Sequence, residues 1–172
     1  MSPSSVPPHP PSSPLPAVSS AARRAWMAVL ARTPRADLEA ALQRALQGRP
    51  TTPAYDWLRP PEIGLAMVRG RIGGSGDPFN LGEATVTRAT LRLHASGDAE
   101  ATVGVACHLG RDRRRAELAA LADALLQMPE HHDSLHRQLI EPFAAQQQAR
   151  GAQQQQDVAA TRVEFFTMVR GD

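Results

Sequence analysis

The sequence predicts an α+β fold: a single layer of mainly antiparallel sheet, with about four to five strands, packed with helices. Apolar residues recur at helical spacing near the start of the chain and again after its middle, whereas the middle alternates apolar and polar residues as β-strands do. Short connections between the consecutive strands favour antiparallel pairing. A last apolar run near the C-terminus predicts one further strand in the same sheet.

The chain divides into a tail and one domain. Residues 1–20 are rich in Pro and Ser and contain no Asp, Glu, Lys or Arg, so this segment has little apolar surface to bury and we expect it to be disordered. Residues 21–172 are long enough to enclose a substantial core. We therefore predict a single α+β domain over residues 21–172.

Two helices are predicted first. Ser19 and Ser20 are suitable N-caps for one, and Thr33 and Pro34 are predicted as the cap and first residue of the next. Helical spacing assigns the buried faces to Trp26, Val29 and Leu30 in the first helix, and to Leu38, Ala41, Leu42, Ala45 and Leu46 in the second.

Three strands follow, and then a return to helix. The strands are predicted over 62–72, 82–94 and 101–109. Asp112 is a suitable cap for the next helix, and the stretch after it is predicted as a helix interrupted at Pro142 and weakened at Gly151. The buried stripe of the helix capped by Asp112 is predicted as Leu118, Leu121, Ala122, Leu125 and Met128.

The C-terminal segment "VEFFTMV" has the composition of a strand. Successive side chains of a strand point to opposite faces, so Phe165 and Phe166 are both buried only if the strand is covered on two sides. One cover would be this domain's helices and the other a partner chain, although a central strand inside one domain fits equally well. The candidate interface residues are Phe165, Phe166, Met168 and Arg170.

Composition excludes several classes of protein. All nineteen basic residues are arginine, so no lysine is present for a phosphate-binding loop or a Schiff base. A net charge of +2 and few aromatic residues argue against a nucleic-acid partner. There is no apolar run long enough to span a membrane and no secretion signal, which favours the cytoplasm. The only cysteine, Cys107, lies in an apolar strand, so we expect a buried core thiol.

A glycine-rich stretch, "RGRIGGSGDPFNLGEATVTR", is the most unusual in the chain. Glycines allow backbone amides to turn inward around an anion, and arginines flank the stretch. The alternative is an ordinary hairpin turn, in which glycine only supplies positive φ angles. The candidate anion-binding residues are Arg71, Gly73, Gly74, Ser75, Gly76 and Arg88.

No catalytic set stands out, and we predict no metal site. His132 and His136 have the helical spacing used for zinc, but the glutamate of a metalloprotease motif is absent. Histidines at this spacing on a helix are more often solvent-exposed side chains than metal ligands. Catalytic residues are therefore not assigned.

Several segments together closely resemble one family, the PhnG subunit of the bacterial carbon-phosphorus lyase system. They are "WMAVLA", "RIGGSGDPFNLGEATVTRATLRL", "LGRDRRRAELAALADALLQ", "LIEPF" and "TRVEFFTMVRGD", and the likeness extends over residues 22–172. The resemblance implies a role in phosphonate catabolism, in the step where a phosphonate displaces adenine from MgATP to give ribose 1-methylphosphonate 5-triphosphate.

The same resemblance implies a hetero-oligomer with the I, H and J subunits, with K and L as further candidates. Because the nucleosidase chemistry is attributed to the I subunit, the resemblance implies an accessory or scaffold role, with no activity alone. It implies no cofactor bound by this chain, with MgATP as a substrate of the complex. The alternative is a direct contribution of the glycine-rich stretch to a shared anion-binding site.

Overall fold

A computed structural model describes residues 18–47, 54–72, 75–94 and 101–160. The α+β prediction is confirmed, with an antiparallel sheet in the order β1-β2-β3. The elements are α1 (Ser20–Leu30), α2 (Arg35–Leu46), β1 (Tyr55–Arg71), β2 (Pro78–Leu93), β3 (Val103–Leu109), α3 (Arg113–Leu126), α4 (Pro129–Leu135), a π-helical turn η2 (His136–Ile140) and α5 (Glu141–Ala160).

The number of strands differs from the prediction. The described residues form three strands rather than four to five. These are the three strands predicted in the middle of the chain, and β1 with 17 residues and β2 with 16 are longer than predicted. The C-terminal part of the described chain is helix α5. The strand predicted over the last residues falls within 161–172, outside the described residues.

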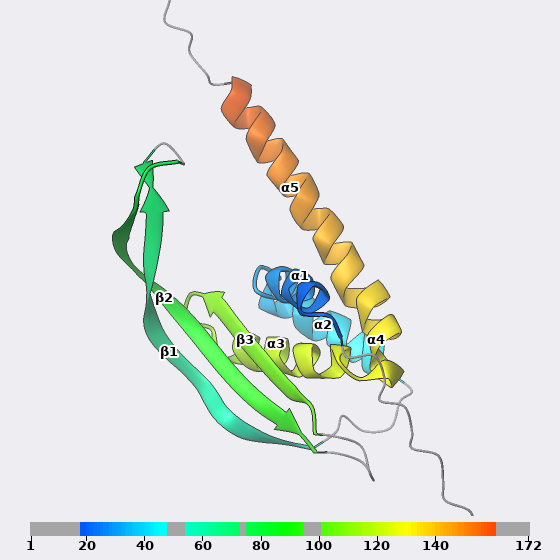
Figure 1. Cartoon of the computed structure of the whole chain (residues 1–172). Helices are drawn as coiled ribbons and strands as arrows, with labels where there is room; N and C mark the ends of the chain where they lie inside the picture. Colours follow the sequence, from blue (N-terminus) through cyan, green and yellow to red (C-terminus); the bar gives the residue numbers. More distant parts are fainter. Residues whose placement is uncertain (1–17, 48–53, 73–74, 95–100, 161–172) are drawn as a thin grey trace, which may run out of the picture.

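Helix α3 forms the centre of the domain. It packs against β2 and β3 on one side, and α1, α2 and α4 pack around it on the other (Figure 1). The stripes predicted from sequence point into this core, although Leu46, Leu121 and Met128 are only partly buried. The largest fully buried apolar side chains are Trp26, Leu38, Leu91, Leu93, Leu125, Leu126, Leu135 and Leu139.

Helix α3 approaches β3 closely because the side chains on both facing surfaces are small. The buried face of α3 is rich in alanine, and Gly104 faces it from β3. A β-carbon at Gly104 would overlap the carbonyl oxygen of Ala120 and lie 2.7 Å from the β-carbon of Ala124. Glycine at this position therefore sets the distance between the sheet and the helix layer.

Two of the predicted helix caps are confirmed, and one is wrong. The Ser19 hydroxyl accepts a hydrogen bond from the amide of Ala22 at 3.2 Å, and the Asp112 carboxylate accepts one from Arg115 at 3.0 Å. Thr33 does not cap α2, because its hydroxyl donates to the carbonyl of Val29 in α1 at 2.9 Å. Pro34 is extended instead of helical, so α2 begins one residue later.

The predicted interruption at Pro142 takes the form of η2. Proline has no amide proton and its ring crowds the carbonyl of the preceding turn, and a π-helical turn widens the helix just before it. Gly151, by contrast, does not end α5, which has no buried residue. Among the described residues, every helix is too short or too polar to cross a membrane.

Candidate functional site

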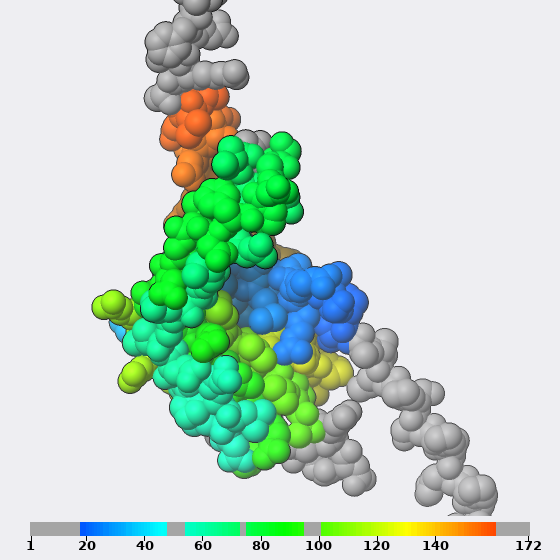
Figure 2. All heavy atoms as spheres, turned by 60° about the vertical axis from the view of Figure 1, so that its left-hand side comes forward, coloured from blue at the N-terminus to red at the C-terminus, as the bar shows by residue number. Residues whose placement is uncertain are grey.

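The distal half of the β1–β2 hairpin projects from the body of the domain. We call residues 65–72 and 75–85 the hairpin arm. Strand β3 pairs with β2 only from Val86 to Arg92, so within the described residues the arm is a two-stranded ribbon with no third strand. It rises on the same side of the body as the far end of α5 (Figures 1 and 2). Two-stranded ribbons are marginally stable in water without further packing.

The arm exposes apolar side chains on both of its faces. Leu65 and Met67 lie on one face of β1, and Leu65 is 60% exposed. The other face carries Val68 and Ile72. Such a concentration of exposed apolar surface is typical of a protein-protein contact. The exposed large apolar residues of the arm are Leu65, Met67, Val68, Ile72, Phe79 and Leu81.

The tip of the arm contains part of the predicted anion site. The Arg71 guanidinium donates to the carbonyl of Gly76 at 2.9 Å, and the Gly76 amide donates to the carbonyl of Ile72 at 3.0 Å. Arg69 and Arg71 belong to the same face of β1 and line a shallow pocket of about 440 Å³. Neither arginine pairs with an acidic side chain among the described residues. Ser75 is exposed beside them.

Arg88 lies away from this tip. In the sheet register Arg71 is opposite Pro78, whereas Arg88 is opposite Glu62 and pairs with its carboxylate at 3.1 Å. From Pro78 to Arg88 the strand rises by about 33 Å. The structure therefore does not bring Arg71 and Arg88 together. Gly73 and Gly74 lie outside the described residues.

The predicted interface residues of the C-terminus, Phe165, Phe166, Met168 and Arg170, also lie outside the described residues. The structure therefore neither places them in the sheet nor excludes them from it, and their assignment stays a prediction.

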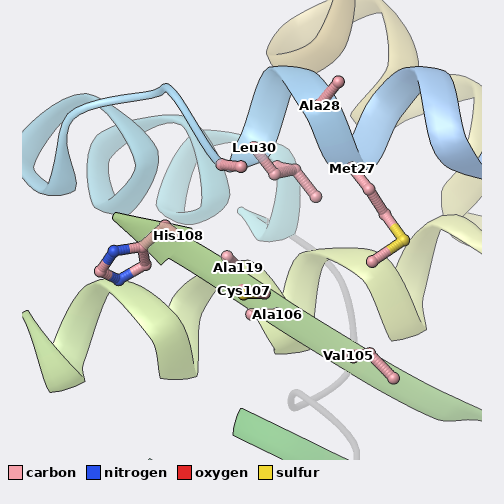
Figure 3. Close-up of a pocket in the computed structure, with 9 residues that line it drawn as sticks. Met27, Ala28, Leu30, Val105, Ala106, Cys107, His108 and Ala119 are labelled. Atoms are coloured by element: carbon pink, nitrogen blue, oxygen red, sulfur yellow. The ribbon is translucent and has the colours of Figure 1, made fainter. Parts of the chain in front are cut away.

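A small apolar groove separates α1 from β3 (Figure 3). Its volume is about 190 Å³, and Met27 and Leu30 point from α1 toward β3. Cys107 also lines it, and the prediction of a buried thiol is wrong because Cys107 is exposed. The alternation of β3 places His108, which is 3% exposed, on the inner face instead. The groove has no arginine in its lining, so it is poorly suited to a phosphate.

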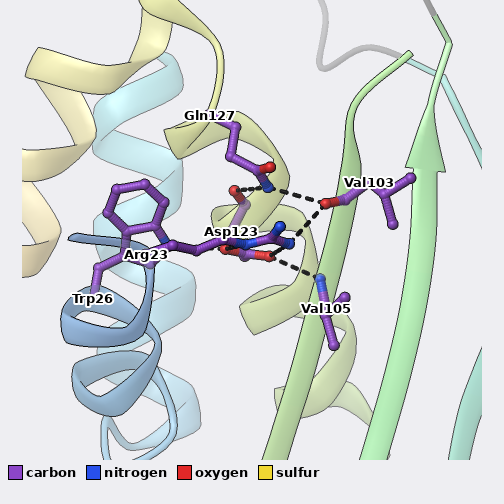
Figure 4. Close-up of polar contacts among 6 residues, drawn as sticks. All are labelled: Arg23, Trp26, Val103, Val105, Asp123 and Gln127. Carbon is purple, nitrogen blue, oxygen red and sulfur yellow. Dashed lines mark hydrogen bonds and ion pairs between the residues drawn. The ribbon is translucent and has the colours of Figure 1, made fainter. Parts of the chain in front are cut away.

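A buried carboxylate that sequence reasoning missed joins three elements (Figure 4). Asp123 of α3 has no exposed surface. It accepts hydrogen bonds from Trp26 Nε1 at 2.8 Å and from the amide of Val105 at 2.9 Å, and it pairs with Arg23 at 2.7 Å. Arg23 and Gln127 also donate to the carbonyl of Val103. All of these donors come from the protein itself, so this cluster is structural.

Two neighbouring groups of β1 have shifted pKa values. Burial and a hydrogen bond to the Glu117 carboxylate raise the pKa of Tyr55, whose hydroxyl donates to Glu117 at 2.9 Å. A hydrogen bond from His94 and its charge lower the pKa of the exposed Asp56. Neither group faces an enclosed cavity, so neither is placed as a general acid or base.

The two histidines singled out by spacing do lie together. His132 and His136 line a polar pocket of about 390 Å³ with Asp133, Arg137 and Glu141. Their rings stack with centroids 5.7 Å apart. The His132 ring also meets the indole of Trp26 edge to face, with centroids 5.8 Å apart.

Comparison with known proteins assigns a family to the chain. The family described as "Phosphonate metabolism protein PhnG" matches residues 21–171. A relative from Rhizobium meliloti (strain 1021), named "Alpha-D-ribose 1-methylphosphonate 5-triphosphate synthase subunit PhnG", is 48% identical over 152 residues, which cover 88% of this chain and 91% of the relative. The match includes the hairpin arm and all of the described helices beyond the start of α1.

Proposed function

The chain belongs to the PhnG family of phosphonate metabolism proteins, and from that premise we propose that it is a subunit of an alpha-D-ribose 1-methylphosphonate 5-triphosphate synthase. The observation that carries the subunit role is the hairpin arm. The arm exposes apolar side chains to water along a ribbon that projects from the domain. Obligate interfaces bury surfaces of this kind.

In this proposal the chain is a scaffold or accessory subunit of the carbon-phosphorus lyase complex, in the cytoplasm where ATP is supplied. Its partners are the I, H and J subunits, and K and L are further candidates. The complex takes MgATP and methylphosphonate and releases adenine. The described residues include no constellation of nucleophile, base and oxyanion donors, which supports assigning the bond-making chemistry to a partner.

Co-expression with the other subunits tests the proposal. We expect the chain to co-purify with them, and Leu65→Asp with Met67→Asp in the arm to abolish co-purification, because charged groups would be buried in the interface. Leu58→Asp is the matched control, since Leu58 is 52% exposed, as Met67 is 51% exposed, but lies in β1 outside the arm. Full co-purification of the arm variant would overturn the role of the arm, and failure of the unsubstituted chain to co-purify would overturn the subunit role.

A second candidate function is a direct contribution to the shared active site through the tip of the arm. Arg69 and Arg71 support it, because two guanidinium groups on one face, with no acidic partner in the described part of the chain, suit a triphosphate or a phosphonate. Arg88 does not belong to this set, because Glu62 neutralises it.

Kinetics of the assembled complex separate the two functions. A direct contribution predicts that Arg71→Ala raises the KM for ATP by about tenfold or more, since a charged hydrogen bond is lost. Arg88→Ala is the control and should leave KM unchanged. Unchanged kinetics of Arg71→Ala in an intact complex would leave only the accessory role.

A further inference from the structure

One stretch of the free edge of β3 has unpaired main-chain groups. The amide of Val105 donates to Asp123 instead of to β2. Hydrogen-bonded pairs alternate along an antiparallel ladder, so Cys107 also directs its amide and carbonyl away from β2. Side chains of the helix layer occupy the edge at Val103 and Val105, but none bonds to Cys107 in the described part of the chain. This stretch is therefore open to the addition of another strand.

An apolar groove lies along the open stretch. It is the groove of about 190 Å³ between α1 and β3 (Figure 3), in which Met27 and Leu30 point toward β3. A cavity of roughly 150 Å³ with apolar walls is large enough to bind benzene. The groove therefore has room for one phenyl ring from a strand that pairs with Cys107.

The groove continues into a positively charged hollow of about 310 Å³. The two share four lining residues, Ala28, Ala31, Cys107 and His108. Arg32 and Arg115 also line the hollow, and none of its lining residues is acidic. Neither arginine forms an ion pair within the described ranges, and the buried Nε of Arg115 has no hydrogen-bond partner there. A strand that fits both parts carries an acidic and an aromatic side chain on one face.

The C-terminal segment has this pattern. Glu164 and Phe166 are two residues apart in "VEFFTMV", so in a strand both side chains point to the same face. Strand β3 runs from the apolar groove toward the charged hollow. An antiparallel strand with Phe165 opposite Cys107 therefore brings Phe166 to the groove and Glu164 to the arginines.

The same chain is too short to fill its own groove in this register. Gln147 of α5 donates to the carbonyl of Val29 at 3.0 Å, beside the groove. Ala160 lies further along the same helix, about 20 Å from Gln147 at the usual rise per residue, and α5 runs away from the body of the domain (Figure 1). From Ala160 to Glu164 a fully extended chain spans at most about 14 Å. The segment that fits must come from another copy.

We propose that residues 163–167 of a second copy of this chain add as an antiparallel strand to the free edge of β3, with Phe166 in the apolar groove and Glu164 at Arg32 and Arg115. The exchange is reciprocal, since a two-fold axis gives each copy the same contact. It covers one open strand edge in each copy. The inference does not depend on the subunit role proposed above.

A disulfide tests the pairing in the full chain, because Cys107 is its only cysteine. Directly opposed residues of a hydrogen-bonded antiparallel pair have Cα atoms about 5.5 Å apart, a distance that a disulfide spans. Under mild oxidation, Phe165→Cys should form a covalent dimer on a non-reducing gel, with the bond to Cys107 identified by mass spectrometry. Gln154→Cys on exposed α5 is the matched control, and it should not form this dimer.

Sedimentation velocity measures the exchange without oxidation. It is measured in a chain with Leu65→Gln and Met67→Gln, which removes the apolar contact of the hairpin arm. We expect a dimer, and Glu164→Arg should weaken it by about tenfold or more because like charges then meet. Adding Arg32→Glu should restore it, and Asp157→Arg, an equal change of charge on α5, should leave it unchanged.

Three results would each overturn the proposal. They are a monomer in place of the dimer, a dimer that Glu164→Arg does not weaken, and a disulfide between Cys107 and the introduced cysteine that forms only within one chain. The last result would show that the segment returns to its own groove.

Discussion

The indole Nε1 of Trp26 donates a hydrogen bond of 2.8 Å to Oδ1 of Asp123, a carboxylate with no exposed surface. This contact and the Arg23 ion pair attach α1 to α3. The same carboxylate accepts from the amide of Val105, on the edge of β3 that β2 leaves free. One buried charge therefore holds three elements in register and also occupies part of an otherwise open strand edge.

Asp123→Asn should lower the free energy of unfolding by about 3 kcal/mol, because it leaves the Arg23 guanidinium without its countercharge. Trp26→Phe removes one donor and part of the indole surface but leaves the ion pair, so we expect a smaller loss of about 1–2 kcal/mol. Denaturant unfolding at neutral pH measures both values. Equal losses for the two variants would show that the ion pair contributes little.

Gly104→Ala should destabilise the domain by about 2 kcal/mol or more, since the new methyl group would overlap the backbone of α3 and push the helix from the sheet. Gly151→Ala in α5 is the matched control. A β-carbon there meets nothing within 4 Å, so helix propensity alone should stabilise the chain by up to about 1 kcal/mol. Thermal unfolding of the two variants compares them directly, and a neutral Gly104→Ala would contradict the close approach of α3 to β3.

The sequence predicted what depends on local spacing. The caps at Ser19 and Asp112 and the apolar stripes of α2 and α3 follow from the side chains alone. Asp123 was missed because a single carboxylate on a helix is usually on its solvent-exposed face. Its position within the apolar run "AALADALL" was a usable local signal of burial.

The exposure of the hairpin arm also could not be predicted from local sequence patterns. Alternation predicts a strand whether its apolar face is covered by this chain or by another, so Leu65 and Met67 gave no sign that they would be exposed. Likewise, the pairing of Arg88 with Glu62 depends on the register between two strands. The register removes Arg88 from the candidate anion site that its nearness in sequence suggested.

Tyr55 should make stability fall at alkaline pH. Burial and the neighbouring Glu117 raise the pKa of its phenol above the ordinary value near 10. The folded state therefore holds the phenolic proton more tightly than the unfolded state. This contribution is complete below about pH 10 and is lost as the pH rises through the folded pKa.

Tyr55 is the only tyrosine in the chain, so the ultraviolet absorbance of phenolate reports its titration directly. We expect a midpoint above that of the unfolded chain, and a shallower alkaline loss of stability in Tyr55→Phe. A phenolate transition at the same pH in the folded and unfolded chains would contradict this prediction.

Replacing Leu65 and Met67 together by Gln should change the free energy of unfolding by less than about 0.5 kcal/mol, because both side chains are half-exposed or more and pack against no core residue. The same variant should reduce self-association of the isolated chain, since it removes apolar surface from one face of the arm. Leu91→Ala in the core part of β2 is the comparison, with an expected loss of about 2–5 kcal/mol because Leu91 is fully buried.

Denaturant unfolding measures the stability of these variants, and sedimentation velocity measures their self-association. A large loss of stability in the Gln variant would mean that the arm contributes to this chain's own core, and the interface role would then fail.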